Sequence, residues 1–136
     1  MLAVYGKRMP ITWTISAADR LVSARGHGTV TLQDVEALLD DVVVKDALAY
    51  RKLFDGREAI GKYDDKDVLL LGARIQAYAT LNLTGAAAIV VANQEQFDVA
   101  LRFANIAQAK RPIRVFFSPE EARAWLDTNP KLDATP

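Results

Sequence analysis

The sequence contains no cysteine and only one histidine, His27. Without cysteine the protein has no disulfide, no thiol nucleophile and no thiolate metal ligand. A single histidine cannot form the multi-histidine ligand sets of zinc sites. Lys and Arg together number 17, and so do Asp and Glu, whereas a nucleic-acid-binding protein normally carries a basic excess. We therefore expect no metal, no cofactor and no nucleic-acid partner.

Long apolar runs are also missing. No run approaches the roughly 20 residues that a helix needs to span a bilayer. At the N-terminus the charged residues follow the short apolar part, which is the reverse of the order in a signal peptide. We expect a cytoplasmic protein without an integral membrane segment. Within it, residues 1–9 are predicted to be a flexible leader, residues 10–127 a single domain, and residues 128–136 a loose tail.

The residues that are present are typical of one globular domain. The chain has 136 residues, of which 51% are hydrophobic and 25% charged, and this is enough to bury a core. Residues 11–15 alternate apolar and polar side chains, and their short connection to residues 21–25 predicts an antiparallel hairpin. Residues 86–92 are apolar without alternation, as in a strand buried on both faces of a parallel sheet. Further strands are predicted at residues 49–54 and 113–117.

Helix start signals lie between these strands. Each combines a cap residue with an acid or amide three positions later, and the pairs are Thr31 with Asp34, Asn93 with Gln96, and Ser118 with Glu121. A further helix is predicted from about Asp65 to Ala79. Gly72 in its middle costs up to about 1 kcal/mol relative to alanine, so we expect this helix to approach another element closely there.

The predicted order of elements is β-β-α-β-α-β-α-β-α. Because alternating strands and helices imply right-handed crossovers, the predicted fold is a single α/β domain with a mostly parallel β-sheet and an N-terminal antiparallel hairpin. We expect the strand at 87–92 in the interior, the strand at 11–16 at or near an edge, and the helices mostly on one face. In that arrangement Trp13 and Ile15 need cover from a second subunit, which favours a homodimer.

The stretch from Ala49 to Leu71 contains the predicted working surface. Its strand is expected to end at Asp55-Gly56, a strong turn signal, and its helix to begin at Asp64 or Asp65. In α/β sheets, ligands and partners usually meet the chain beyond the carboxyl ends of the strands. The candidate binding surface therefore comprises Asp55, Arg57, Glu58, Asp64 and Asp65.

Each candidate residue has a structural interpretation as well as a functional one. Asp64 and Asp65 are either helix caps or a permanently negative surface. Arg57 and Glu58 are either a solvated pair or a clamp for an anion. His27 is either a turn residue that ends the second strand or a base. Adjacent carboxylates on a helix point apart, so the acid pairs of this chain make poor general acid/base pairs. We expect no catalytic residues.

The segments that carry a family resemblance lie in a characteristic order. They are Arg20-Leu21-Val22, Arg25-Gly26-His27-Gly28-Thr29-Val30-Thr31, Leu53-Phe54-Asp55-Gly56-Arg57-Glu58, Ala88-Ile89-Val90-Val91-Ala92, Ile113-Arg114-Val115-Phe116 and Glu121-Ala122-Arg123-Ala124-Trp125-Leu126. With this order and spacing, residues 10–127 resemble the SpoIIAA-like group of the STAS superfamily. The resemblance implies a wound β-α domain whose better-known members are anti-anti-sigma factors. Those bind a partner kinase through the loop and helix after the third strand, and phosphorylation of a serine at that helix start breaks the complex.

This sequence departs from that pattern at the regulatory position. From Leu32 to Ala79 there is no serine or threonine, so a serine switch is excluded there, and Asp64 and Asp65 occupy the helix start. We predict a non-enzymatic, STAS-like regulatory or protein-interaction module with a protein partner. The alternative is a small-ligand or lipid-binding domain with a pocket between sheet and helices near Gly72. A third hypothesis is an enzyme that relies on Asp55, Arg57 or His27.

Overall fold

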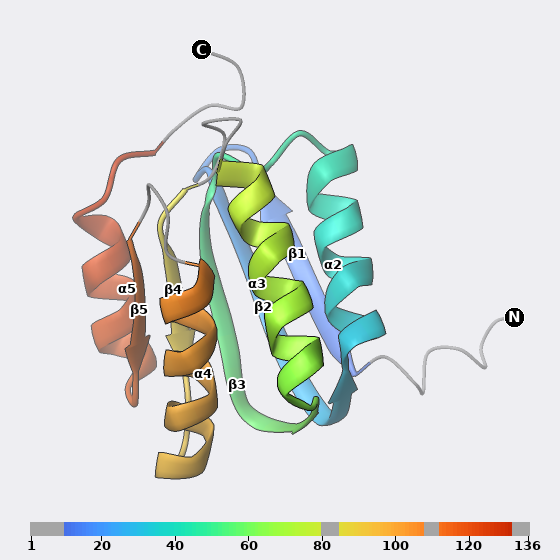
Figure 1. The fold of residues 1–136 in the computed structure, drawn as a ribbon. Helices are drawn as coiled ribbons and strands as arrows, with labels where there is room; N and C mark the ends of the chain where they lie inside the picture. The colour runs from blue at the N-terminus through green and yellow to red at the C-terminus, as the bar shows by residue number, and fades with distance from the viewer. Residues whose placement is uncertain (1–9, 80–84, 108–111, 132–136) are drawn as a thin grey trace, which may run out of the picture.

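A five-stranded sheet in the order β1-β2-β3-β4-β5 forms the centre of the protein (Figure 1). The computed structural model describes residues 10–79, 85–107 and 112–131; the predicted leader and most of the predicted tail lie outside these ranges. The strands are β1 (Ile11–Ser16), β2 (Leu21–Thr31), β3 (Arg51–Lys62), β4 (Ala87–Val90) and β5 (Ile113–Phe116). The helices are α2 (Leu32–Val44), α3 (Asp65–Ala79), α4 (Gln94–Ala107) and α5 (Pro119–Asp127).

The sheet topology confirms the predicted α/β domain. β1 pairs with β2 in antiparallel orientation, with Ile11 opposite Gly26 and Ser16 opposite Leu21. The remaining pairs, β2–β3, β3–β4 and β4–β5, are parallel. β1 is an edge strand and β4 lies between β3 and β5, as the sequence predicted.

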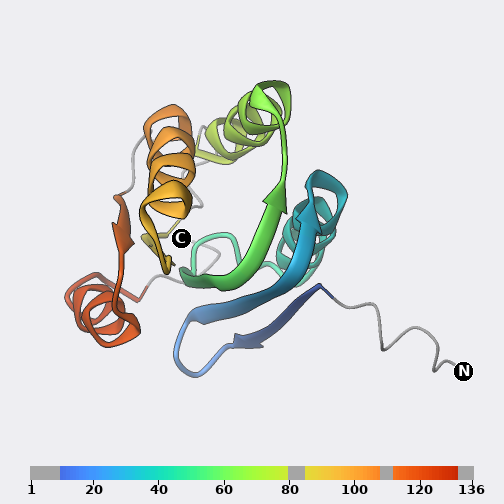
Figure 2. The same ribbon diagram turned by 90° about the horizontal axis from the view of Figure 1, so that it is seen from below.

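The helices cover the two faces unequally. α2, α3 and α4 lie on one face of the sheet and α5 on the other (Figure 2). Alternate side chains of β4 point to opposite faces of the sheet. Ala88 and Val90 belong to the core cluster that contains Ala122 and Leu126 of α5, whereas Ala87 and Ile89 line the side of α2, α3 and α4. Most of the helical cover is thus on one face, in agreement with the prediction.

Local capping accounts for the helix starts. At α2 the backbone N–H of Thr31 donates to Asp34 Oδ2 at 2.8 Å, and the N–H of Asp34 donates to Thr31 Oγ1 at 3.4 Å. At α5 the hydroxyl of Ser118 accepts from the N–H of Glu121 at 3.2 Å. Each contact satisfies an amide that has no partner inside its helix. The predicted starts of α2 and α5 are confirmed.

The predicted ends of β2 and β3 were wrong. Gly26-His27-Gly28 does not end β2, and Asp55-Gly56 does not turn the chain, because both segments lie inside longer strands. After a register shift between Arg25 and His27, the two strands pair again from His27 opposite Glu58 to Thr31 opposite Lys62. The additional ladder outweighs the local turn preference. A Cβ at Gly26 would lie 2.9 Å from Ala59 Cβ, so glycine permits the close approach of the strands at this bulge.

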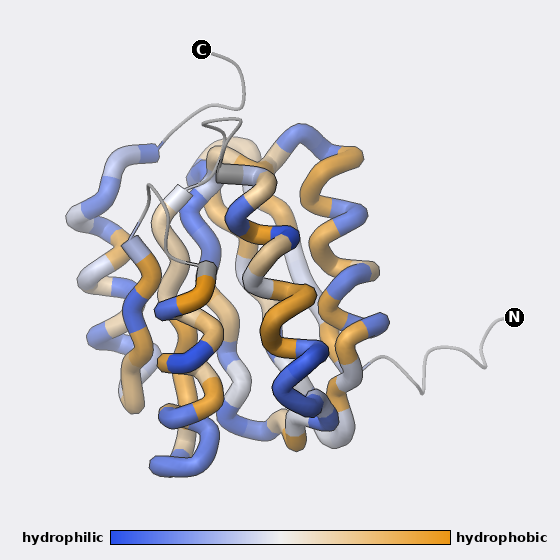
Figure 3. The backbone as a smooth tube through the Cα atoms, viewed as in Figure 1, coloured by the Kyte–Doolittle hydropathy of each residue, from blue (hydrophilic) through white to orange (hydrophobic). Residues whose placement is uncertain are grey.

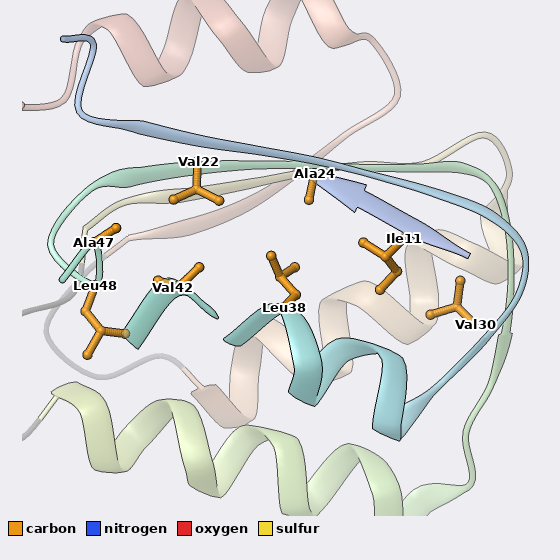
Figure 4. Close-up of a cluster of buried hydrophobic side chains, with 8 residues drawn as sticks. All are labelled: Ile11, Val22, Ala24, Val30, Leu38, Val42, Ala47 and Leu48. Carbon is orange, nitrogen blue, oxygen red and sulfur yellow. The ribbon is translucent and has the colours of Figure 1, made fainter. Parts of the chain in front are cut away.

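The main core cluster lies between β1–β2 and α2. Figure 4 shows Leu38 and Val42 of α2 pointing toward Val22, Ala24 and Ile11 of the sheet. Leu38 is 2% exposed and Val42 is 1% exposed. Their positions four residues apart place both on the inward face of the helix. This cluster fixes α2 over the edge of the sheet.

The reason given for a homodimer was also wrong. Trp13 and Ile15 are partly buried and pack against the same core cluster, so their cover comes from this chain. Trp13 is additionally anchored to α2 by a hydrogen bond from its indole N–H to Asp41. This argument for a homodimer is therefore withdrawn, and the homodimer itself stays a prediction.

Candidate functional site

A cavity of about 200 Å³ lies between the sheet and helices α2, α3 and α4. Its sheet side includes small residues from three adjacent strands, namely Ala24 and Gly26 from β2, Gly56 and Ala59 from β3, and Ala87 from β4, beside the larger Ile11, Val30, Phe54 and Ile89. The helices line the opposite side with larger apolar side chains, namely Val35, Leu38, Leu39, Leu71, Ile75 and Phe103. Leu71 flanks Gly72, so the cavity lies in the region that the sequence suggested for a pocket.

The small residues explain why space remains there. A Cβ at Gly56 would meet only the carbonyl oxygen of Val90, at 3.6 Å, which is an ordinary van der Waals contact. Gly56 therefore borders open space. Protein interiors contain few voids larger than a water molecule. A cavity of this volume is therefore unusual for a protein core.

Lys52 is a charged residue in the cavity wall. It is 4% exposed, and its ammonium donates to the carbonyl oxygens of Leu48 at 2.5 Å and Tyr50 at 2.7 Å. These carbonyls belong to the segment that leads into β3, so the chain just before the strand holds the ammonium in place. The sequence analysis missed Lys52, because an isolated lysine in a strand carries no sign of burial.

Two tyrosines also line the cavity, Tyr63 after β3 and Tyr78 in α3. Burial, with a smaller contribution from the charge of Asp34, raises the pKa of Tyr63 above its ordinary value. The hydroxyl of Tyr78 accepts from Arg74 Nε at 2.5 Å, and Arg74 also pairs with Asp40 of α2. The phenol of Tyr63 therefore stays neutral near pH 7 and offers a hydrogen bond rather than a charge.

Asp55 and Arg57 form a close ion pair on β3. Arg57 donates from Nε to Asp55 Oδ1 at 3.0 Å and from a terminal nitrogen to Oδ2 at 2.8 Å. Hydrogen bonding by the Arg57 side chain holds the pKa of Asp55 below its ordinary value, despite partial burial. The carboxylate of Asp55 is therefore ionised near pH 7, and Arg57 balances its charge.

Glu58 bridges two neighbours on β2. It lies 3.2 Å from a terminal nitrogen of Arg25 and 3.2 Å from Nδ1 of His27. The sequence alone does not reveal an acid beside His27, because His27 and Glu58 are brought together only by the β2–β3 register. All three side chains are exposed, with 45–59% of each in contact with solvent, so the cluster is a surface network.

Asp64 and Asp65 begin α3 with separate partners. Asp64 Oδ1 accepts from the N–H of Asp67 at 2.8 Å, and Asp67 Oδ2 accepts from the N–H of Asp64 at 3.3 Å. Asp65 forms an ion pair with Arg102 of α4. The five residues of the candidate binding surface thus have contacts within this chain, three of them along β3 and two at the start of α3.

Metal binding finds no support in residues 10–79, 85–107 and 112–131. In those ranges no group of three or more histidine or acidic side chains could hold an ion. Among the same residues, no helix is both long and apolar enough to cross a bilayer.

Comparison with known proteins establishes the fold. No protein-family model matches the sequence, and no curated protein matches it. The structure is similar to the crystal structure of an uncharacterized protein of the DUF3478 family from Shewanella loihica PV-4, which is described as having a SpoIIAA-like fold. The TM-score is 0.60 at 18% sequence identity, over 85% of this chain and 93% of that one. The expectation of a SpoIIAA-like α/β fold is therefore confirmed.

Proposed function

We propose that this protein is a non-enzymatic binding module and that its cavity under α2, α3 and α4 holds a small apolar ligand. The observation that carries the proposal is the apolar cavity of about 200 Å³. Ligand sites in proteins are concave and mostly apolar, with a few polar groups that orient the ligand. Lys52, Tyr63 and Tyr78 are such groups here.

The size of the cavity limits the ligand. An engineered cavity of about 150 Å³ lined by aliphatic and aromatic side chains stays dry and binds benzene. By that comparison the present cavity accommodates an apolar body of about eight carbon atoms. Long-chain lipids exceed this volume unless part of the chain stays outside.

The cavity favours a small ligand over a charged partner surface. Every residue of the candidate surface already has a hydrogen bond or ion pair within the chain. A protein that docked on this surface would compete with those contacts, whereas a ligand in the cavity would add contacts to side chains that border empty space.

Isothermal titration calorimetry with 1-octanol and indole tests the proposal. We expect saturable binding at one site by the wild type. Ala87→Leu, which adds volume at a cavity position that is 3% exposed, should weaken binding at least tenfold, and Gly56→Val should act in the same direction. Ala73→Leu is the matched control, since Ala73 is an exposed residue of α3. Absence of binding by the wild type, or equal binding by all four proteins, would contradict the proposal.

A protein-interaction module is the second candidate function. Two large apolar side chains of α3 are exposed, Leu69 at 57% and Leu70 at 51%. Figure 3 shows that the same helix begins with a hydrophilic segment. The anti-anti-sigma factors that this sequence resembles contact their partner kinases through the corresponding helix. Replacement of both leucines by aspartate should abolish stoichiometric capture of a protein from a native lysate, and unchanged capture would remove this candidate.

A further inference from the structure

We propose that the free edge of β1 is an interface with a second copy of this chain, in which two β1 strands pair in antiparallel orientation and join two sheets into one. The interface concerns the margin of the sheet, so it goes beyond the proposed function and forms with or without a ligand in the cavity. Both the interaction surface and the partner are thereby assigned, since each copy uses the same strand.

β1 lacks the devices that commonly protect an edge strand. It is an edge strand of the sheet (Figure 2), and its six residues, Ile11–Ser16, include no charged residue and no proline. Natural proteins prevent edge-to-edge association with charged side chains, proline or bulges on such strands. β5, the other edge strand, is shorter and carries Arg114. Of the two edges, β1 is the one suited to pairing with another strand.

The pairing of β1 with β2 determines which backbone groups remain at the edge. The carbonyl oxygen of Pro10 accepts from the N–H of His27 at 2.7 Å, and the β1–β2 register places these two residues opposite each other. Hydrogen-bonded and non-hydrogen-bonded pairs alternate along an antiparallel ladder. Ile11, Trp13 and Ile15 therefore point their N–H and C=O groups away from β2, toward the outside of the sheet that the structure describes.

These backbone groups fit a second β1 strand related by a twofold axis. With Trp13 of one copy opposite Trp13 of the other, Ile11 of each copy lies opposite Ile15 of the other. Each of these pairs is of the kind that exchanges two hydrogen bonds in an antiparallel sheet, so every outward backbone group of the three residues finds a partner. A twofold contact of this kind is self-complementary and closes at a dimer.

The side chains on both faces of β1 suit this register. Ile11, Trp13 and Ile15 lie on the face that α2 covers, so the two copies together form one apolar row across the new strand pair. Thr12 and Thr14 point to the opposite face and are exposed. In the dimer they lie opposite each other, and threonine pairs across antiparallel strands are favourable.

The position of α2 leaves the right space for the second copy. α2 packs against β1 and β2 together, and neighbouring strands are about 4.8 Å apart. A helix above the β1–β2 pair therefore lies about one strand spacing from the twofold axis, which puts the two α2 helices about 10 Å apart. Packed helices are typically about 8–10 Å apart, so the two helices meet without a clash or a gap.

α2 also presents an exposed apolar side chain toward the second copy. Asp41 accepts a hydrogen bond from Trp13, and Ala37 and Val44, one turn before and after Asp41, share its side of the helix. Val44 is 80% exposed, and in the antiparallel helix pair it faces the small Ala37 of the other copy. Lys45 pairs with Asp41 within each copy, so that carboxylate brings no unpaired charge to the interface.

Sedimentation equilibrium tests the interface. We expect the wild type to form a dimer. Thr12→Lys combined with Thr14→Lys places lysines opposite each other across the two copies and should weaken dimerisation at least tenfold at low ionic strength, where exposed charges are least screened. Ala73→Lys combined with Gln76→Lys, at exposed positions of α3, adds the same charge and should dimerise as the wild type does. A wild type that stays monomeric over a hundredfold range of concentration, or equal association of all three proteins, would overturn the proposal.

Cysteine cross-linking tests the register, because the chain itself has no cysteine. In the proposed pairing Thr12 of one copy and Thr14 of the other form a non-hydrogen-bonded pair with Cα atoms about 4.5 Å apart, within the reach of a disulfide. The two copies of Thr12, like the two copies of Thr14, are diagonal neighbours about 7–8 Å apart, beyond that reach. An oxidised mixture of Thr12→Cys and Thr14→Cys should therefore cross-link in non-reducing electrophoresis, and neither variant alone should do so.

The two experiments separate the interface from its register. Cross-linking by Thr14→Cys alone would centre the twofold axis on Thr14 and overturn the pairing around Trp13. A dimer in sedimentation without a cross-link in any of the samples would place the contact elsewhere on the chain and overturn the β1 interface. Neither result bears on the cavity, whose ligand is tested separately by calorimetry.

Discussion

The indole N–H of Trp13 donates a 2.8 Å hydrogen bond to Asp41 Oδ2, across 28 residues of sequence. Trp13 lies on the edge strand β1 and Asp41 on α2, so the contact ties the edge of the sheet to the helix that covers it. Asp41 also accepts from Lys45 Nζ at 2.9 Å, one turn along the helix. The apolar side of the edge strand is thereby covered within a single chain.

Removal of this hydrogen bond should change the titration of Asp41. The bond from Trp13, followed by that from Lys45, holds the pKa of Asp41 below its ordinary value. We therefore expect Trp13→Phe to raise the pKa of Asp41 toward that value, measured by NMR titration of the side-chain carboxyl carbon.

The same contact predicts a pH dependence of stability. A carboxyl group whose pKa is lower in the folded state stabilises the fold above its unfolded-state pKa, and that contribution is lost as the pH falls through the folded-state pKa. The stability difference between wild type and Trp13→Phe should therefore shrink under acid conditions. Urea unfolding at pH 7 and at pH 2.5 measures it, and a difference that grows in acid would contradict this account.

Two glycines should respond differently to alanine. A Cβ at Gly85 would lie 2.5 Å from the carbonyl oxygens of Ala49 and Tyr50, which are backbone atoms that cannot move aside. Gly85→Ala should destabilise the protein by about 1–3 kcal/mol, the usual cost of overpacking. Gly56→Ala, at a position with space, is the control and should cost less than about 1 kcal/mol. Equal midpoints of urea unfolding for both variants would show that the segment before β4 is not as closely packed as described.

The cap of α2 should contribute measurably to stability. Thr31→Ala removes the hydroxyl that accepts from Asp34, and loss of such a cap costs about 1 kcal/mol. Thr31→Ser keeps the hydroxyl and should recover most of the loss. Chemical denaturation of the three proteins measures both effects. Comparable losses for serine and alanine would assign the effect to the missing methyl group instead of the hydrogen bond.

We expect the two aspartates at the start of α3 to act as structural residues that stabilise the helix start. Asn caps a helix about as well as Asp, so Asp64→Asn should cost no more than the charge–dipole contribution of about 0.3–1 kcal/mol. Asp65→Asn loses the exposed pair with Arg102, which is worth about 0–1 kcal/mol. Asp64→Ala should cost more than Asp64→Asn.

A double variant that combines Asp64→Asn and Asp65→Asn tests whether these residues bind a partner. No serine or threonine occurs from residue 32 to 79, so we expect no Ser/Thr phosphorylation in residues 55–68 and a surface that is permanently available. If the double asparagine variant captures the same proteins as the wild type, Asp64 and Asp65 serve only as helix caps. Loss of capture with unchanged stability would instead support a role in binding.

The sequence by itself determined the helix starts and the central strand. Thr31 and Ser118 satisfy amides three residues away, so neighbours in the sequence are sufficient to predict them. The apolar run at residues 86–92 indicated a strand buried on both faces, and β4 (Ala87–Val90) is interior. Once strands and helices alternate, the short list of permitted crossovers largely sets the topology. For this reason the edge position of β1 and the interior position of β4 were predicted correctly.

Tertiary contacts decided where β2 and β3 end. Asp55-Gly56 favours a turn locally, and a glycine inside a strand costs roughly 0.5–1 kcal/mol. The extended pairing from His27 to Thr31 adds several backbone hydrogen bonds, each worth about 0.5–1.5 kcal/mol. These contacts join segments about 30 residues apart, so a local turn signal cannot reveal them.

The candidate site depended most on the tertiary structure. The sequence suggested a pocket between sheet and helices near Gly72, but its volume, its small-residue wall and the buried Lys52 follow from packing. Gly56 and Ala87 come from different strands, and Leu38 and Ile75 from different helices, yet all four border the cavity. The space left between elements depends on how side chains from distant segments interdigitate, and local periodicity carries no information about that.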